Sequence, residues 1–141
     1  MSLVKLPCYC GTLRQVTRAI TVRYDEHLRG AGIRAAQFNL LQALKFKPGA
    51  RNADLVDWLA IDQTTVTRNL EVLRRNRLVE ITGRPSGREK CWSLTAKGEA
   101  LNAKAEPFWH AAQTEIRRRL GAERMRGLHD DTFDLAQLLA G

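Results

Sequence analysis

Two short amphipathic segments separated by only three residues are the feature of this sequence that most constrains its fold. Apolar residues recur at helical spacing in both segments: Leu55, Val56 and Leu59 in the first, and Val66, Leu70 and Leu73 in the second. Asn52 and Asp62 are suitable caps for the two helices, because a short polar side chain accepts a bond from the free N–H groups at a helix start. Helices joined by so tight a turn do not pack antiparallel side by side, so the pattern predicts a helix-turn-helix.

The hydrophobic period changes after this pair of helices. Residues 78–82 and 90–94 have the composition of strands, and the turn-forming, basic residues 83–88 separate them. A β-hairpin with a basic tip, called a wing, is therefore predicted. A further helix over about residues 35–47, ended by Pro48 and Gly49, precedes the pair. The segment 35–95 is thus predicted to be a winged helix-turn-helix.

Longer amphipathic helices are predicted on both sides, over residues 8–30 and 96–141. Thr95 is a suitable cap for the second region, Pro107 is expected to kink or divide its long helix, and a last helix follows Gly121. Their apolar stripes exceed what a small winged-helix core covers, so they are expected to pack against a second copy of the chain. The expected fold is mainly α with a small β-hairpin wing, as one domain over residues 1–141.

The charge of the chain points toward a polyanionic partner. Of 141 residues, 23 are Lys or Arg and 15 are Asp or Glu, which gives a net charge of +8. A basic surface gains affinity for nucleic acid through counterion release, but excess arginine on a solvated surface or attraction to an acidic membrane would give the same composition. The position of the charges favours nucleic acid over these alternatives. Seven basic and only four acidic residues lie in residues 62–90, the segment of the second short helix and the hairpin.

The polar side of the second short helix is the strongest candidate for DNA contact. An ordinary solvated helix would carry Glu and Lys pairs there, whereas this one carries threonines of low helix propensity together with amides and one arginine. Its candidate residues are Gln63, Thr64, Thr65, Thr67, Arg68 and Asn69. On the hairpin, Arg84, Arg88 and Lys90 are candidates for phosphate or minor-groove contact. The alternative is a winged-helix module that binds protein without specific DNA recognition.

Other function classes lack support in the sequence. The motifs of phosphate-binding loops, serine hydrolases and zinc proteases are absent, so we expect no enzyme and no cofactor. His27, His110 and His129 lack metal-ligand spacing, so no metal site is expected. The three tryptophans are expected to pack in the core or a dimer interface. Residues 1–7 lack a secretory h-region and no apolar run approaches the length of a membrane span, which favours a cytoplasmic protein without membrane contact.

Several short strings, in this order, resemble the MarR family of bacterial transcriptional regulators. Residues 59–68 match the pattern L-x-x-x-x-x-T-V-T-R, and Leu94-Thr95-x-x-Gly98 closes the wing. The resemblance implies a homodimeric winged-helix repressor on pseudo-palindromic operator DNA, released by a small-molecule effector or an oxidant. It also implies an effector pocket near the junction of the first, second and fifth helices. Ser86 stands where many members have an acidic residue two positions before the wing arginine, here Arg88.

Cys10 is a candidate redox sensor. It lies at the start of the first predicted helix, where the helix dipole and nearby Arg14 favour a thiolate, which would oxidise and condense with Cys8 or Cys91. Its position resembles that of the reactive cysteine in the hydroperoxide-sensing branch of the family, and Tyr24 matches a tyrosine that bonds that cysteine. Arg14 and Ala36 stand where that branch has further tyrosines. The alternative is a small residue packed under the dimer.

Overall fold

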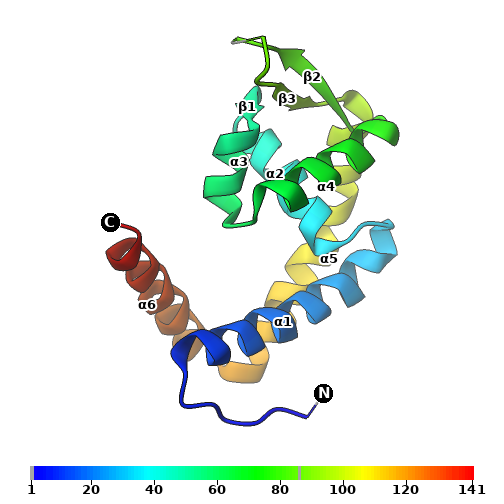
Figure 1. Ribbon diagram of the computed structural model, residues 1–141. Coiled ribbons are helices and arrows are strands. Elements are labelled where there is room, and N and C mark those ends of the chain that lie inside the picture. Colours follow the sequence, from blue (N-terminus) through cyan, green and yellow to red (C-terminus); the bar gives the residue numbers. More distant parts are fainter. Residues whose placement is uncertain (1, 86) are drawn as a thin grey trace.

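The computed structural model describes residues 2–85 and 87–141, and its upper part in Figure 1 is a winged helix-turn-helix. The helices are α2 (Ala35–Phe46), α3 (Asn52–Leu59) and α4 (Gln63–Arg75), and the strands are β1 (Ala50–Arg51), β2 (Val79–Gly83) and β3 (Cys91–Leu94). The predicted fold class is confirmed. Strand β1 was not predicted; it completes an antiparallel sheet of order β1-β3-β2, with Ala50 opposite Trp92.

Local hydrogen bonds explain where α3 and α4 begin. Asp62 caps α4 as predicted, because its carboxylate accepts the Thr65 N–H at 2.9 Å and the Thr65 hydroxyl at 2.6 Å. The prediction that Asn52 caps α3 is wrong. Arg51 is the N-cap, and its backbone N–H donates to Asp54 Oδ2 at 3.0 Å. Asn52 is the first helical residue, and its Oδ1 instead accepts the indole N–H of Trp92 at 2.6 Å.

The core lies where α2, α3 and α4 meet the sheet and α5. Large, fully buried side chains come from α2, α3, α4 and β3, among them Phe38, Leu41, Leu55, Leu70, Leu73 and Trp92. The helical members are the apolar positions at helical spacing, and burying each such side chain stabilises the fold by about 1.5–3 kcal/mol relative to exposure. The core therefore fixes the opposite, polar side of α4 toward solvent.

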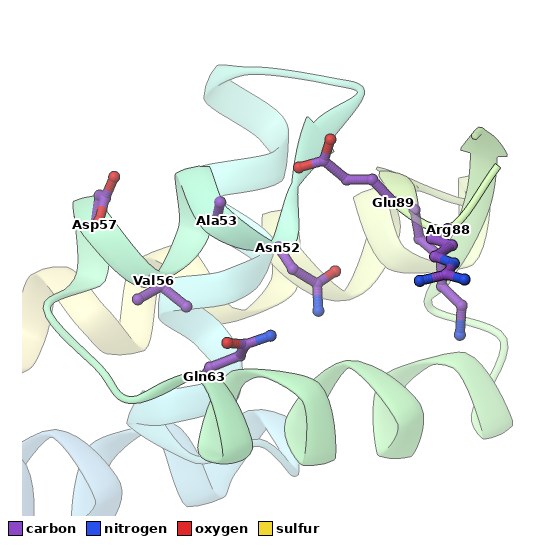
Figure 2. A pocket seen from close by; sticks show the side chains of 8 residues that line it. Asn52, Ala53, Val56, Asp57, Gln63, Arg88 and Glu89 are labelled. Atoms are coloured by element: carbon purple, nitrogen blue, oxygen red, sulfur yellow. The ribbon is translucent and has the colours of Figure 1, made fainter. Parts of the chain in front are cut away.

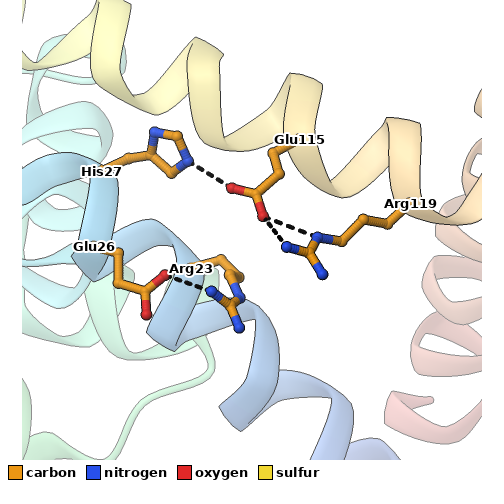
Figure 3. Close-up of polar contacts among 5 residues, drawn as sticks. All are labelled: Arg23, Glu26, His27, Glu115 and Arg119. Atoms are coloured by element: carbon orange, nitrogen blue, oxygen red, sulfur yellow. Dashed lines mark hydrogen bonds and ion pairs between the residues drawn. The ribbon is translucent and has the colours of Figure 1, made fainter.

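Two long helices connect this unit to the rest of the chain. Helix α1 (Tyr9–Leu28) is followed by the short 3₁₀ helix η1 (Arg29–Ala31), and it packs along α5 (Ala96–Leu120). Figure 3 shows the polar contacts where α1 and α5 meet: His27 Nε2 lies 2.8 Å from Glu115 Oε2, and Arg119 pairs with the same carboxylate at 2.7 Å. Hydrogen bonds from His27, which has the larger effect, and from Arg119 lower the pKa of the Glu115 carboxyl group.

The sequence predicted that Pro107 would kink or divide its helix. Pro107 does not divide α5. The helix continues without interruption from Ala96 to Leu120. Proline removes the N–H that would bond to the carbonyl of Ala103, but both residues are exposed, so water is available to that carbonyl. A proline on the solvent side of a helix therefore leaves the helix whole here.

The last helix, α6 (Ala122–Ala140), follows Gly121 as predicted and contains no buried residue. Figure 1 shows it extending from the end of α5, separate from the winged-helix unit. Its most exposed apolar side chains are Phe133 at 58%, Leu138 at 79% and Leu139 at 77%. Among the described residues, no helix combines the length and apolarity needed to cross a bilayer.

Candidate nucleic-acid interface

The solvent side of α4 carries four of the six candidate residues predicted on this helix. Gln63, Thr64, Thr67 and Arg68 are exposed, while the apolar stripe of the same helix is buried. Asp62 holds the first turn in place, and the hydrogen bonds from Thr65 lower the pKa of its carboxyl group. Among the described residues, Arg68 makes no ion pair, so its guanidinium is available to a ligand.

The two other candidates on α4 lie differently. Thr65 is half-buried, and its hydroxyl already donates to Asp62. Asn69 is also half-buried. The structure therefore gives Thr65 a local role in capping the helix. Direct DNA contact by either residue stays a prediction.

The wing presents two exposed arginines and one lysine that has partners. Arg84 and Arg88 are exposed and make no ion pair with any described residue. Lys90 is half-buried, with Nζ 3.8 Å from Glu71 Oε1 and 5.8 Å from the centre of the Trp92 ring. Ser86, where the family pattern has an acidic residue, lies outside the described residues.

A groove of about 380 Å³ joins the helices to the wing. Figure 2 shows Asn52 and Gln63 on the helical side of this groove and Arg88 on the wing side. Asp57 and Glu89 also line it, and Glu89 Oε1 lies 3.7 Å from Arg51 Nη1. Polar donors from α3, α4 and the wing thus face a single concave surface.

Sequence reasoning missed the part that Asn52 plays in this groove. Its amide donates to Thr67 Oγ1 at 3.3 Å while its carbonyl oxygen accepts the Trp92 indole N–H, so it connects α3, α4 and β3. The only sequence signal was a polar residue near a helix start, which predicts a cap equally well. The contact depends on the tertiary fold.

The residues predicted to sense oxidants are not brought together within one chain. Cys10 is exposed in the first turn of α1, with Arg14 Nη2 3.6 Å from its Sγ. Tyr24 lies fourteen residues further along the same helix, which corresponds to about 21 Å. Its hydroxyl donates to Gln113 Oε1 at 2.7 Å, and burial raises its pKa. Cys8 is exposed next to the start of α1, and Cys91 is half-buried in β3.

Over residues 2–85 and 87–141, no three His, Cys, Asp or Glu side chains lie close enough together to hold an ion. The groove brings the amides of Asn52 and Gln63 and the guanidinium of Arg88 together beside the exposed polar side of α4, a set that suits phosphates and base edges.

Comparison with known proteins agrees with this geometry. A family model described as a winged helix DNA-binding domain matches residues 35–98. No curated protein sequence matches the chain significantly. Among solved structures, Escherichia coli MarR in its apo form has a TM-score of 0.76 at 21% identity, covering 93% of this chain and 98% of its own.

The transcriptional regulator MosR of Mycobacterium tuberculosis, solved in complex with DNA, is 33% identical. The match covers 94% of this chain and 98% of MosR, with a TM-score of 0.79. The chain belongs to the MarR family. The resemblance found in the sequence is therefore confirmed, and membership of the MarR family makes the protein a DNA-binding transcription regulator and not an enzyme.

A third solved structure has the same fold. BpsR of Bordetella bronchiseptica, whose DNA binding is described as regulated by 6-hydroxynicotinic acid, is 24% identical over the full length of both chains, with a TM-score of 0.79. The shared architecture thus extends from α1 to α6.

Proposed function

We propose that this MarR-family protein is a homodimeric repressor that binds pseudo-palindromic operator DNA and is released by a small molecule or an oxidant. The observation that carries the DNA assignment is the exposed polar side of α4, where Gln63, Thr64, Thr67 and Arg68 lie beside the groove and the wing. The MosR complex with DNA supports it. In this proposal α4 enters the major groove, and Arg84 and Arg88 follow the backbone into the minor groove.

The exposed apolar surface of the terminal helices supports the homodimer. Leu13 and Val16 on α1, and Phe133 and Leu138 on α6, are between 38% and 79% exposed in the single chain. Residues 8–30 and 96–141 would then be the dimerisation helices. A twofold axis through such an interface relates two α4 helices, which matches the symmetry of a palindromic operator.

Release by an effector would act at the junction of α1, α2 and α5, where a hollow of about 360 Å³ lies between the dimerisation helices and the winged-helix unit. The regulation of BpsR by a small molecule supports this route. The alternative trigger is Cys10. Its thiolate would attack a hydroperoxide, yielding a sulfenic acid and an alcohol, and the sulfenic acid would condense with the Cys8 thiol to form a disulfide and water.

DNA contact is tested with single substitutions on selected operator duplexes. An operator is first obtained by in vitro selection from random duplexes, and binding is then measured by fluorescence anisotropy. Arg68→Ala should weaken specific binding by about 1–3 kcal/mol if the arginine makes a bidentate base contact. Arg88→Ala should weaken binding to matched and scrambled duplexes alike and reduce the salt slope by about one.

Arg29→Ala is the matched control, because this substitution removes the same charge. Arg29 is exposed in η1, away from the groove. Unchanged affinity in both Arg68→Ala and Arg88→Ala, with folding intact, would contradict the DNA interface. It would favour the alternative of a winged-helix protein-interaction module.

The homodimer is tested by light scattering. Phe133→Glu and Leu138→Glu each place two charges in an isologous interface and should yield monomers or aggregates. A stable monomer of the unmodified protein at micromolar concentration would refute the assembly.

The oxidant trigger is tested with stoichiometric cumene hydroperoxide. Operator release in the unmodified protein should disappear in Cys10→Ser and persist in Cys91→Ser. Release that persists in Cys10→Ser would exclude Cys10 as the sensor.

A further inference from the structure

Two acidic residues line the groove between the helices and the wing, on a surface that is proposed to face DNA. These residues are Asp57 on α3 and Glu89 on the wing. A carboxylate close to DNA phosphates repels them, so both groups would weaken DNA binding if charge alone decided the affinity. Their surroundings differ. Asp57 is exposed and makes no ion pair with any described residue, whereas Glu89 is half-buried, with its Oε1 3.7 Å from Arg51 Nη1.

The partner of Glu89 is itself held in a fixed orientation. The Arg51 guanidinium donates from Nε to Asp54 Oδ2 at 3.1 Å and from Nη2 to Asp54 Oδ1 at 2.9 Å, and Asp54 belongs to the first turn of α3. The remaining nitrogen, Nη1, is the one that faces Glu89. A bidentate pair orders the arginine side chain, and exposed ion pairs contribute mainly when they form such networks. Glu89 therefore meets a cation whose position is set by the start of α3.

The wing depends on side-chain contacts at this point, because the sheet ends there. Among the described residues, the last paired residue of β3 toward the wing tip is Cys91, opposite the end of β1. Arg88 lies three residues beyond it. Each of the two residues between them makes an ion pair: Glu89 with Arg51, and Lys90 with a carboxylate of α4 at 3.8 Å. These two ion pairs are the fixed points next to Arg88.

Holding Glu89 also orients the residue before it. Residues 89 and 90 lead into β3 without a turn, and successive side chains of such a segment point to different sides. In Figure 2 the Glu89 carboxylate is directed away from α4, and Arg88 leaves the wing in a different direction. Arg88 is exposed and makes no ion pair with any described residue, so its position follows from the segment that carries it.

We propose that Glu89 is a positioning residue for the wing: its ion pair with Arg51 holds Arg88 where it reaches the DNA. This inference rests on the proposed DNA interface, of which it names the group that aligns the wing. Arg88 makes the DNA contact, and Glu89 acts through Arg88. An acidic residue beside the DNA thus strengthens binding, which is the opposite of the sign that charge alone gives.

The test measures binding of the full chain to the selected operator by fluorescence anisotropy. Glu89→Gln keeps the size of the side chain but removes the ion pair, and it should weaken binding by about two- to fivefold, the range of an exposed ion pair within a network. Asp57→Asn is the matched control, since it also removes one negative charge from the groove lining. It should strengthen binding, because it removes a repulsion and no ion pair. Urea denaturation verifies that both variants are folded.

A double substitution shows whether Glu89 acts through Arg88. In the Arg88→Ala background, Glu89→Gln should no longer weaken binding, because no arginine remains to be positioned. The salt dependence gives a second readout that a general loss of stability would not change. The salt slope of Glu89→Gln should fall toward that of Arg88→Ala, since a displaced arginine neutralises its phosphate less fully.

Three results would overturn the proposal. The first is operator binding by Glu89→Gln that is as tight as in the unmodified protein or tighter. The second is an equal loss with and without Arg88, which would mean that Glu89 acts independently of the wing arginine. The third is an equal loss in Asp57→Asn.

Arg88→Ala alone separates this inference from the interface on which it rests. If this variant binds the operator as tightly as the unmodified protein, the wing contact is wrong and its alignment by Glu89 is wrong with it. If Arg88→Ala weakens binding and Glu89→Gln does not, the wing contact stands and only the alignment is overturned.

Discussion

Gly98 lies in the first turn of α5, directly against the main chain of Leu78. A Cβ atom at this position would come 2.0 Å from the Leu78 carbonyl oxygen and 3.0 Å from its carbonyl carbon, far inside van der Waals contact. That same oxygen accepts the backbone N–H of Thr95 at 3.1 Å. Gly98→Ala must therefore move either the start of α5 or the start of β2.

The sign of this effect is opposite to that of an ordinary helix substitution. Alanine inside a helix is more favourable than glycine by about 1 kcal/mol. Overpacking costs about 1–3 kcal/mol, and losing the Thr95 to Leu78 hydrogen bond costs about 1 kcal/mol more. We expect Gly98→Ala to lower the free energy of unfolding by about 1–3 kcal/mol, measured by urea denaturation at fixed protein concentration.

Ala100→Gly is the control, because Ala100 is exposed two residues further along α5. It should cost about 1 kcal/mol through helix propensity alone. If Gly98→Ala were as stable as the unmodified protein or more stable, while Ala100→Gly lost stability as expected, the close approach of the two backbones would be refuted.

Three further substitutions test the contacts that hold the winged-helix unit together. Thr95→Ala removes a hydroxyl that accepts from the first turn of α5 at 3.0 Å, and should lower the free energy of unfolding by about 1–2 kcal/mol in urea denaturation; an unchanged midpoint would contradict the cap. Asn52→Ala leaves the buried indole N–H of Trp92 without its acceptor and should cost about 1–3 kcal/mol in the same assay, whereas a neutral result would mean that another acceptor replaces it. The hydrogen bond from Arg51 holds the pKa of Asp54 at about 2, below its ordinary 3.8, so its contribution to stability is complete above about pH 4 and is lost as the pH falls from 3.8 toward 2. Asp54→Asn should flatten the dependence of Tm on pH in that window, and an unchanged profile would refute the coupling.

Elements with a repeating pattern were predictable from the sequence, and elements made by single contacts were not. The stripes of α4 and the caps Asp62 and Thr95 follow from spacing and side-chain chemistry, and the structure has both. Strand β1 has only two residues, Ala50 and Arg51, so no alternation exists to reveal it. It forms because β3 is present to pair with it.

The candidate site shows the same division. Exposure of Arg68 follows from its place opposite the buried stripe of α4, so periodicity was sufficient. The contacts of Lys90 with Glu71 and Trp92 join residues that are close only in the folded chain, so sequence alone treated Lys90 as equal to Arg88. Trp58 was expected to pack in the core or in a dimer interface; in the single chain it lies outside the core, 45% exposed, with Lys47 Nζ 5.1 Å from its ring centre.

The unbroken helix α5 has a mechanical consequence. It begins next to β3 with no flexible linker and continues for 25 residues to Gly121, so it is a rod of about 37 Å. Tilting such a rod by about 10° displaces its far end by about 6 Å. Trp92 pairs with β1 and β2 and is bonded to Asn52, which ties the wing to α3, and α2 packs on α5, so we expect the wing and the helices to follow the rod together. A small rotation at the α1 end thus becomes a translation of α4 comparable to one helical turn, with no bending inside the winged-helix unit.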